Sequence, residues 1–349
     1  MAEPIMQLEH LTRRFRTRKG TIKAADDVSL TLNGGDILCL VGESGSGKTT
    51  VARMAGGLLK PSEGRVIFEG KDLAEMNKDE FAEYRKAVQI IHQDPYASLN
   101  PVHTIGDTLR APLLHHKIAT NRRDATRRAG ELLELVDLRP VENFIDKYPH
   151  QLSGGQRQRV SIARAMTLNP RMIIADESVS MVDVSIRVSL LNTMLKLRNE
   201  LGVTFLFITH DLAVVKYFAW EGRIGVMYVG KLIEYGRTPK LIGRPMHPYT
   251  RALAAAIPEA DPDLTRSKSK LQLRSLDIPN LNELPDGCVF HPRCPYWIRG
   301  ECDTIVPPLV DVGEGREVAC HVVVRDIEEG GNGMDLQATD DPALSGAAD

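Results

Sequence analysis

Aromatic residues are scarce in this 349-residue sequence, at 5% of the chain. A protein that stacks nucleic-acid bases on aromatic side chains would carry more of them. An excess of positive charge is also missing, because the formal net charge is −2. Nucleic-acid-binding proteins usually show a basic excess. The composition therefore argues against a nucleic-acid partner.

Long hydrophobic runs are absent as well. No apolar stretch approaches the roughly 20 residues that a membrane-spanning helix needs. The first ten residues, M-A-E-P-I-M-Q-L-E-H, lack a basic region followed by an apolar run, so no signal peptide is visible. We expect a cytoplasmic protein, which would reach a membrane only through a partner.

One cysteine, Cys39, precedes residue 288, and it lies inside an apolar run. The other four, Cys288, Cys294, Cys302 and Cys320, are separated by five, seven and seventeen residues. In a chain with no export signal, such a cluster favours a metal over disulfides. The spacing is not the paired C-x₂-C of a zinc ribbon, and four thiolates suit a [4Fe–4S] cluster. Zinc and unligated reduced thiols remain open.

Strands and helices alternate from residue 1 to about residue 240, which predicts an α/β domain with a largely parallel sheet. Residues 172–175 and 204–208 are short, continuous apolar runs, as expected for strands covered on both faces. Residues 36–41 form another such run, followed by a glycine-rich turn and a helix over 49–59. Charged helical segments between 105 and 138 predict a helical insertion within the domain.

The glycine-rich turn, Gly42-Glu43-Ser44-Gly45-Ser46-Gly47-Lys48-Thr49, fits the phosphate-binding P-loop pattern, and Thr50 follows it. A strand precedes it and a helix follows, which is the context that the motif requires. Glycines let backbone amides turn toward phosphates, Lys48 neutralises charge, and the Thr49 hydroxyl can bind Mg²⁺. We expect the nucleotide to contact Gly42, Ser44, Gly45, Gly47, Lys48, Thr49 and Thr50.

Two carboxylates end the apolar strand that begins at Ile173. Asp176 is expected to help hold Mg²⁺, and Glu177 to polarise the water that attacks the terminal phosphate. The alternative is a pair of solvent-facing acids that cap a turn. His210 ends the strand T-F-L-F-I-T-H, at the edge of the sheet where α/β proteins bind ligands. We expect it to contact the terminal phosphate and the water.

Gln93 follows the strand that ends at Ile91, and its amide can reach Mg²⁺ or the water. Alone, it reads equally well as a polar residue in a turn before Pro95. Phe15 can stack on an adenine ring, although an aromatic residue in an early strand is more often core packing. Gln93 and Phe15 are therefore assigned to the site only because the other motifs are also present.

A second phosphate-binding turn is predicted at Leu152-Ser153-Gly154-Gly155-Gln156, called the signature turn below. A hydroxyl and glycine amides at a helix N-terminus form an anion site. A single nucleotide needs only one such turn from each chain, so the P-loop and the signature turn that bind it are expected to come from different subunits of a dimer. The loop Ser180 to Asp183 would cross the dimer interface, while Asp183 can also be the N-cap of the next helix.

In this order, these motifs resemble those of the nucleotide-binding subunit of ATP-binding cassette (ABC) transporters, over residues 5 to about 240. The resemblance implies a P-loop ATPase fold: a mixed sheet core, an antiparallel β subdomain and a helical subdomain at about 95–165. It also implies a head-to-tail dimer, in which Ser153, Gly154, Gly155 and Gln156 of one chain close on ATP held by the other chain. The catalytic groups are all present, so we expect an active ATPase.

The runs Q-D-P-Y-A-S-L-N-P, M-H-P-Y-T-R-A-L and G-C-V-F-H-P-R-C-P are similar to the oligopeptide/dipeptide importer branch. The wording Y-A-S-L-N-P resembles the second ("F-type") ATPase of that branch more than the first. The resemblance implies a second, different ATPase subunit, two membrane permease subunits and an extracytoplasmic solute-binding protein. It places the chain peripherally, at the cytoplasmic face of the inner membrane. The cargo would be peptides, or alternatively oligosaccharide or nickel. The same resemblance favours a [4Fe–4S] cluster at the four cysteines.

The texture of the sequence changes after about residue 240. We expect residues 241–325 to form a small C-terminal extension that carries the four cysteines. Residues 326–349 contain seven acidic residues and no Lys or Arg, which predicts a disordered acidic tail.

Overall fold

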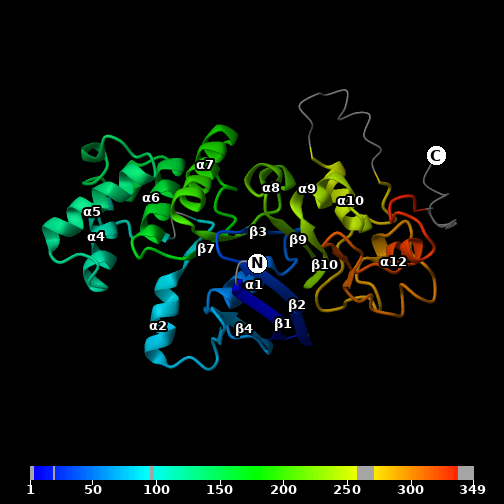
Figure 1. The fold of residues 1–349 in the computed structure, drawn as a ribbon. Coiled ribbons are helices and arrows are strands. Elements are labelled where there is room, and N and C mark those ends of the chain that lie inside the picture. The colour runs from blue at the N-terminus through cyan, green and yellow to red at the C-terminus, as the bar shows by residue number, and fades with distance from the viewer. Residues whose placement is uncertain (1–3, 19, 95–97, 258–270, 337–349) are drawn as a thin grey trace.

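The computed structural model describes residues 4–18, 20–94, 98–257 and 271–336, which form two sheets and several groups of helices (Figure 1). The smaller sheet is antiparallel, with the strand order β2-β1-β4-β5. Its strands are β1 (Pro4–Thr17), β2 (Gly20–Asn33), β4 (Glu63–Phe68) and β5 (Lys71–Asp72).

The larger sheet is mixed and has the strand order β11-β12-β10-β9-β3-β8-β7-β6. Neighbouring strands from β9 through β3, β8 and β7 to β6 pair in parallel. The pairs β9–β10, β10–β12 and β12–β11 are antiparallel. The strands are β3 (Ile37–Val41), β6 (Val88–Ile91), β7 (Met172–Asp176), β8 (Thr204–Ile208), β9 (Arg223–Tyr228), β10 (Lys231–Arg237), β11 (Val310–Asp311) and β12 (Glu317–Val318). Parallel pairing brings the carboxyl ends of β3, β7 and β8 to one edge, where the predicted nucleotide site begins.

Strand β3 lies between two hydrophobic cores because both of its faces are covered. Ile37, Cys39 and Val41 face one core, and the alternating residues Leu38 and Leu40 face the other. The first core includes helices α7 (Val184–Leu201), α8 (Leu212–Phe218) and α9 (Thr238–Gly243). The second includes α1 (Lys48–Ala55) and the antiparallel sheet. This burial accounts for the uninterrupted apolar sequence of the strand.

A group of helices stands at one end of the larger sheet, on the left in Figure 1. It consists of α4 (Ile105–His115), α5 (Arg122–Leu135) and α6 (Gly154–Met166), with short 3₁₀ turns at Val141–Asn143 and Pro149–Gln151. Polar residues cap the helices α4 and α5: the side chains of Thr104 and Asn121 accept the amides of Asp107 and Asp124. Helix α2 (Lys78–Ala87) precedes β6 and begins with a capping box at Asn77.

The C-terminal extension packs against the opposite end of the sheet (Figure 1). It contains α10 (Pro248–Ala255), a 3₁₀ turn η3 (His291–Arg293) and α12 (His321–Glu328). Its strand β12 pairs with β10, so the extension continues the larger sheet.

The first residues of the segment expected to be a disordered acidic tail are folded. Residues 326–328 belong to α12, and Arg251 donates hydrogen bonds to the carbonyl oxygens of Gly333 and Met334. The remainder of the expected tail, residues 337–349, lies outside the described residues.

Among the helices of the described ranges, none combines the length and the apolar character that crossing a membrane requires.

Candidate nucleotide-binding site

The P-loop connects β3 to α1, and two of its glycines are required by close packing. Gly42 has φ 151° and Gly47 has φ 100°, conformations that side chains disfavour. A Cβ atom on Gly42 would lie 2.1 Å from the carbonyl oxygen of Met227, and one on Gly47 would lie 2.1 Å from that of Ala24. The loop is therefore pressed against β9 and β2, which fixes the direction of its amides.

The Lys48 ammonium lies inside the curve of this loop. It donates to the carbonyl oxygens of Gly42 and Glu43, both at 2.8 Å, and to the Ser46 hydroxyl at 3.1 Å. Burial lowers the pKa of Lys48, while the carboxylates of Glu177 and Asp176 oppose that effect. A buried cation within a ring of backbone groups suits an anionic ligand such as a phosphate.

Asp176 and Thr49 meet across the site. The Thr49 hydroxyl donates to Asp176 Oδ1 at 3.1 Å, which joins the end of β7 to the first turn of α1. Burial raises the pKa of Asp176. Hydroxyl and carboxylate oxygens are ligands that Mg²⁺ prefers, so these two residues fit the ion that accompanies ATP.

Glu177 is the centre of a group of three side chains from three different strand ends. Gln93 Nε2 donates to Glu177 Oε2 at 3.0 Å, and His210 Nδ1 lies 3.5 Å from Glu177 Oε1. The Glu177 backbone has φ 46°, and its amide donates to the carbonyl oxygen of Ile208 at 3.0 Å. A non-glycine residue held in this conformation is typical of functional sites. The structure thus brings together the three residues predicted to be catalytic.

The signature turn begins α6, where Ser153 is the N-cap. Its hydroxyl accepts the Gln156 amide at 3.3 Å, and the Gln156 side chain accepts the Ser153 amide at 3.0 Å. Ser153 is exposed and Gly155 is buried. Helix α6 lies apart from α1 (Figure 1), so the signature turn and the P-loop of this chain do not share one site.

Asp183 and Phe15 are two further residues that the sequence predicted for the site. Asp183 occupies the N-cap position of α7, but its side chain makes no capping hydrogen bond. Phe15 lies on β1 opposite Ile22 and is only partly buried, with the Arg13 guanidinium 4.9 Å from its ring centre. Its partial exposure differs from that of a core residue.

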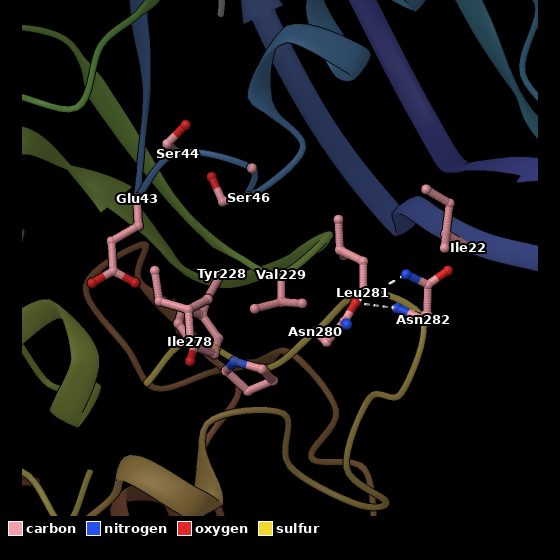
Figure 2. A pocket seen from close by; sticks show the side chains of 12 residues that line it. Ile22, Glu43, Ser44, Ser46, Tyr228, Val229, Ile278, Asn280, Leu281 and Asn282 are labelled. Atoms are coloured by element: carbon pink, nitrogen blue, oxygen red, sulfur yellow. Dashed lines mark hydrogen bonds between the residues drawn. The ribbon is translucent and has the colours of Figure 1, made fainter. Parts of the chain in front are cut away.

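A cavity of about 290 Å³ lies beside the P-loop (Figure 2). Its walls are residues 43–46 of the P-loop, Ile22 of β2, the end of β9 and residues 278–282 of the extension. In the last of these walls, Asn280 Oδ1 accepts hydrogen bonds from the amide and the side chain of Asn282, both at 3.0 Å. Sequence reasoning missed this wall, because nothing in residues 278–282 signals proximity to a loop so distant in the chain.

The four clustered cysteines are mostly buried, and burial raises their thiol pKa values, to about 11 for Cys288 and about 12 for Cys320. Throughout the described ranges, no group of three or more His, Cys, Asp or Glu side chains is arranged to hold a metal ion. The expectation of a [4Fe–4S] or zinc site is therefore not supported by the geometry.

Two protein families match the chain. Residues 25–180 match the family "ABC transporter", and residues 233–302 match "Oligopeptide/dipeptide transporter, C-terminal region". The first range contains the P-loop, the signature turn and Glu177. The second begins in β10 and ends within the extension.

Similar curated proteins extend over most of the chain. A probable peptide ABC transporter ATP-binding protein of Sinorhizobium fredii is 42% identical over 92% of this chain and 91% of its own length. A putative peptide import ATP-binding protein of Brucella ovis is 44% identical over 91% of this chain and 97% of its own. The oligopeptide transport ATP-binding protein AppF of Bacillus subtilis is 41% identical over 88% of this chain and 92% of its own.

A solved dimeric ATP-binding cassette, bound to ADP and Pi in a post-hydrolysis state, is 30% identical and superimposes with a TM-score of 0.60. It corresponds to 67% of this chain and 98% of its own. Together with the mixed sheet described above, this similarity confirms the expected ABC ATPase fold. The chain therefore belongs to the ATPase subunits of ABC transporters, in the group that carries the oligopeptide/dipeptide transporter C-terminal region.

Proposed function

We propose that this chain is one of two different ATPase subunits that drive the import of peptides through a pair of membrane permeases. The observation that carries the proposal is the contact of Gln93 and His210 with Glu177, beside a complete P-loop. Peptide cargo is supported by the names of the similar proteins from Sinorhizobium fredii, Brucella ovis and Bacillus subtilis. Oligosaccharide and nickel are the alternative cargoes.

The side chains of the site divide the work of hydrolysis. Glu177 accepts a proton from water as general base, and His210 and Gln93 hold the carboxylate and the water in line with the terminal phosphate. Lys48 balances the charge of the phosphates. Thr49 and Asp176 would hold Mg²⁺, with Gln93 within reach, and the ion would neutralise charge that develops on the phosphate oxygens.

The second half of each site comes from a partner subunit in this proposal. Ser153 is exposed at the N-terminus of α6, where a hydroxyl and backbone amides favour an anion. Met181, in the loop that precedes α7, is 64% exposed, and Val184, the first residue of α7, is 72% exposed; both are apolar. Exposed apolar residues beside an anion-binding turn suit a protein interface that closes over a nucleotide. Phe15 would contact the adenine ring.

The permease docking surface is proposed to lie beyond Gln93, between the loop that follows it and the helical group. A cavity of about 540 Å³ opens there, lined by residues that include Asn100, Asp107 and Arg164. Val102, next to it, is 72% exposed. A permease segment in this position would contact the loop that follows Gln93. Movement of that loop would change the hydrogen bond between Gln93 and Glu177, and so couple the permease to ATP hydrolysis. The complex would also include an extracytoplasmic solute-binding protein, with this chain on the cytoplasmic face of the membrane.

We further propose that the four cysteines of the extension converge to bind a [4Fe–4S] cluster, although in the described residues they are not arranged as a metal site. Support comes from the pKa of Cys294, which is raised by burial and by the neighbouring thiols of Cys320, Cys288 and Cys302, so the four cysteines lie near one another. Backbone amides also donate to sulfur, from Tyr296 to Cys294 Sγ at 3.4 Å and from Ile298 to Cys302 Sγ at 3.3 Å. An absorption band near about 400 nm in anaerobically purified protein would support the cluster. Zinc without that band would contradict it.

The experiment for the main proposal is purification of the tagged chain from native membranes. We expect two different permeases and a second ATPase subunit to purify with it. In that complex, Glu177→Gln should lower ATP hydrolysis and peptide uptake by at least about 10²-fold while ATP still binds, because only the general base is lost.

The matched control is Glu221→Gln, which changes an exposed carboxylate outside the site. A soluble homodimer without membrane partners would reject the importer and favour a soluble cassette ATPase. A partnered complex without any ATPase activity would favour a regulatory protein that only binds ATP.

A further inference from the structure

The C-terminal extension binds Glu43, the residue that follows the first glycine of the P-loop. Glu43 follows Gly42, and its carboxylate receives two hydrogen bonds from the Arg293 guanidinium. Nη1 donates to Oε2 at 2.8 Å, and Nη2 donates to Oε1 at 3.1 Å. The Arg293 side chain is 6% exposed and that of Glu43 is 28% exposed. A paired, charge-assisted contact of this kind is strong and directional.

Arg293 has little freedom to move, because aromatic rings surround it. Its guanidinium lies 5.7 Å from the ring centres of both Tyr228 and Phe290, and Nη1 also lies 3.3 Å from the Tyr228 hydroxyl. These rings are buried and pack on each other, with centres 5.3 Å apart. Tyr228 ends β9, the neighbour of the strand that leads into the P-loop. The arginine is thus held rigidly between the extension and the central sheet.

Glu43 is held through its backbone as well as through its side chain. Its amide donates to the hydroxyl of Tyr249, in α10, at 2.8 Å. Figure 2 shows the Glu43 side chain directed away from that of Ser44. Two points of attachment therefore fix the start of the P-loop. A P-loop binds phosphate through the direction of its amides, so a fixed start limits how the loop can open.

We propose that Arg293 is a positioning residue for the nucleotide site, through which the C-terminal extension sets the affinity of the P-loop for ATP. The inference rests on the nucleotide site and is independent of the cargo. It assigns to the extension a direct role in ATP binding, and it predicts that any displacement of η3 weakens that binding.

The test compares Arg293→Met, Glu43→Gln and the double variant in the full-length chain. ATP affinity is measured by titration, and KM and kcat in the assembled complex. We expect Arg293→Met to raise the Kd and the KM for ATP about tenfold with little change in kcat, because the loop is misplaced while Glu177 is untouched. In the Glu43→Gln background, Arg293→Met should add less than about twofold, since the partner is already altered.

Arg251→Met is the matched control, because this arginine binds carbonyl oxygens of residues 333 and 334 instead of the P-loop. An unchanged Kd in a folded Arg293→Met protein, or losses that simply add in the double variant, would overturn the proposal. If Arg293→Met does not fold, Arg293→Lys supplies the same comparison, and an unchanged Kd there overturns it too. ATP binding that survives Lys48→Ala would instead reject the nucleotide site itself, a result that the Arg293 variants cannot produce.

Discussion

At the scale of single residues, the two glycines of the signature turn differ in the room around them. A Cβ atom on Gly155 would lie 2.4 Å from Cγ2 of Ile186, in α7. On Gly154 it would meet nothing within 4 Å. Gly155 is thus a contact between the helix that carries the signature turn and the helix that follows the loop of Asp183, whereas Gly154 is free to face a ligand.

We predict that Gly155→Ala destabilises the protein by about 1–3 kcal/mol, because the stiff, β-branched Ile186 must shift. Gly154→Ala, the matched control, should be neutral or stabilising by up to about 1 kcal/mol through its helix propensity. Urea unfolding measures both changes. Adding Ile186→Ala should remove most of the clash of Gly155→Ala. Equal effects of the two alanine substitutions would show that the packing argument is wrong.

At the scale of elements, the start of α10 depends on a histidine that must be neutral. His247 Nδ1 accepts the amide of Tyr249 at 3.1 Å, which caps the helix. His247 is fully buried, and burial together with the charge of Arg251 lowers its pKa from 6.5 to about 3. A protonated ring cannot accept the amide. The same helix carries the hydroxyl of Tyr249 that binds Glu43, so this cap supports the nucleotide site.

We predict that acid destabilises the protein through His247. The unfolded chain binds a proton below pH 6.5 and the folded chain does not until about pH 3, so stability present above pH 6.5 is lost as the pH falls toward 3. At pH 5 the loss from this residue would be about 2 kcal/mol. His247→Asn keeps a capping oxygen and should flatten the change in melting temperature between pH 7 and pH 5. His150→Asn, at an exposed position, should leave it unaltered.

At the scale of the whole molecule, a buried ion pair attaches the extension to the central sheet. Arg316 Nη2 lies 3.2 Å from Glu234 Oε1, and the side chains are 4% and 1% exposed. Glu234, on β10, also accepts the amides of Met246 at 3.0 Å and His247 at 2.9 Å. Burial raises the pKa of Glu234, which these hydrogen bonds and Arg316 oppose. The carboxylate thus connects β10, the start of α10 and the segment before β12.

We predict that Arg316→Met lowers the free energy of unfolding by about 3–5 kcal/mol, because a buried carboxylate loses its counter-charge. Combining it with Glu234→Gln should recover part of that loss, since the amide is neutral. Lys240→Met removes an exposed ion pair with Glu314 and should change the free energy of unfolding far less, because solvent screens that pair. Denaturant unfolding of the full chain measures all three. A single Arg316→Met variant as stable as Lys240→Met would contradict the prediction.

The sequence by itself determined the local parts of this protein. The apolar runs of β3, β7 and β8 predict buried parallel strands, and the residues at their carboxyl ends must then meet at one edge of the sheet. The P-loop is a contiguous motif whose glycines are required by backbone geometry. Ser153 and Gln156 form their capping box within four residues. These features are short-range or periodic, so they can be recognised without knowledge of the fold.

Only the tertiary structure decided which distant segments complete the site. Glu43 and Arg293 are 250 positions apart, and the sequence around neither residue indicates that the two are in contact. The contact exists because the extension packs against the central sheet and places η3 beside the P-loop. In the same way, the hydrogen bonds of Arg251 with residues 333 and 334 attach part of the expected tail to α10. Such contacts depend on how elements pack, and packing is a property of the folded chain as a whole.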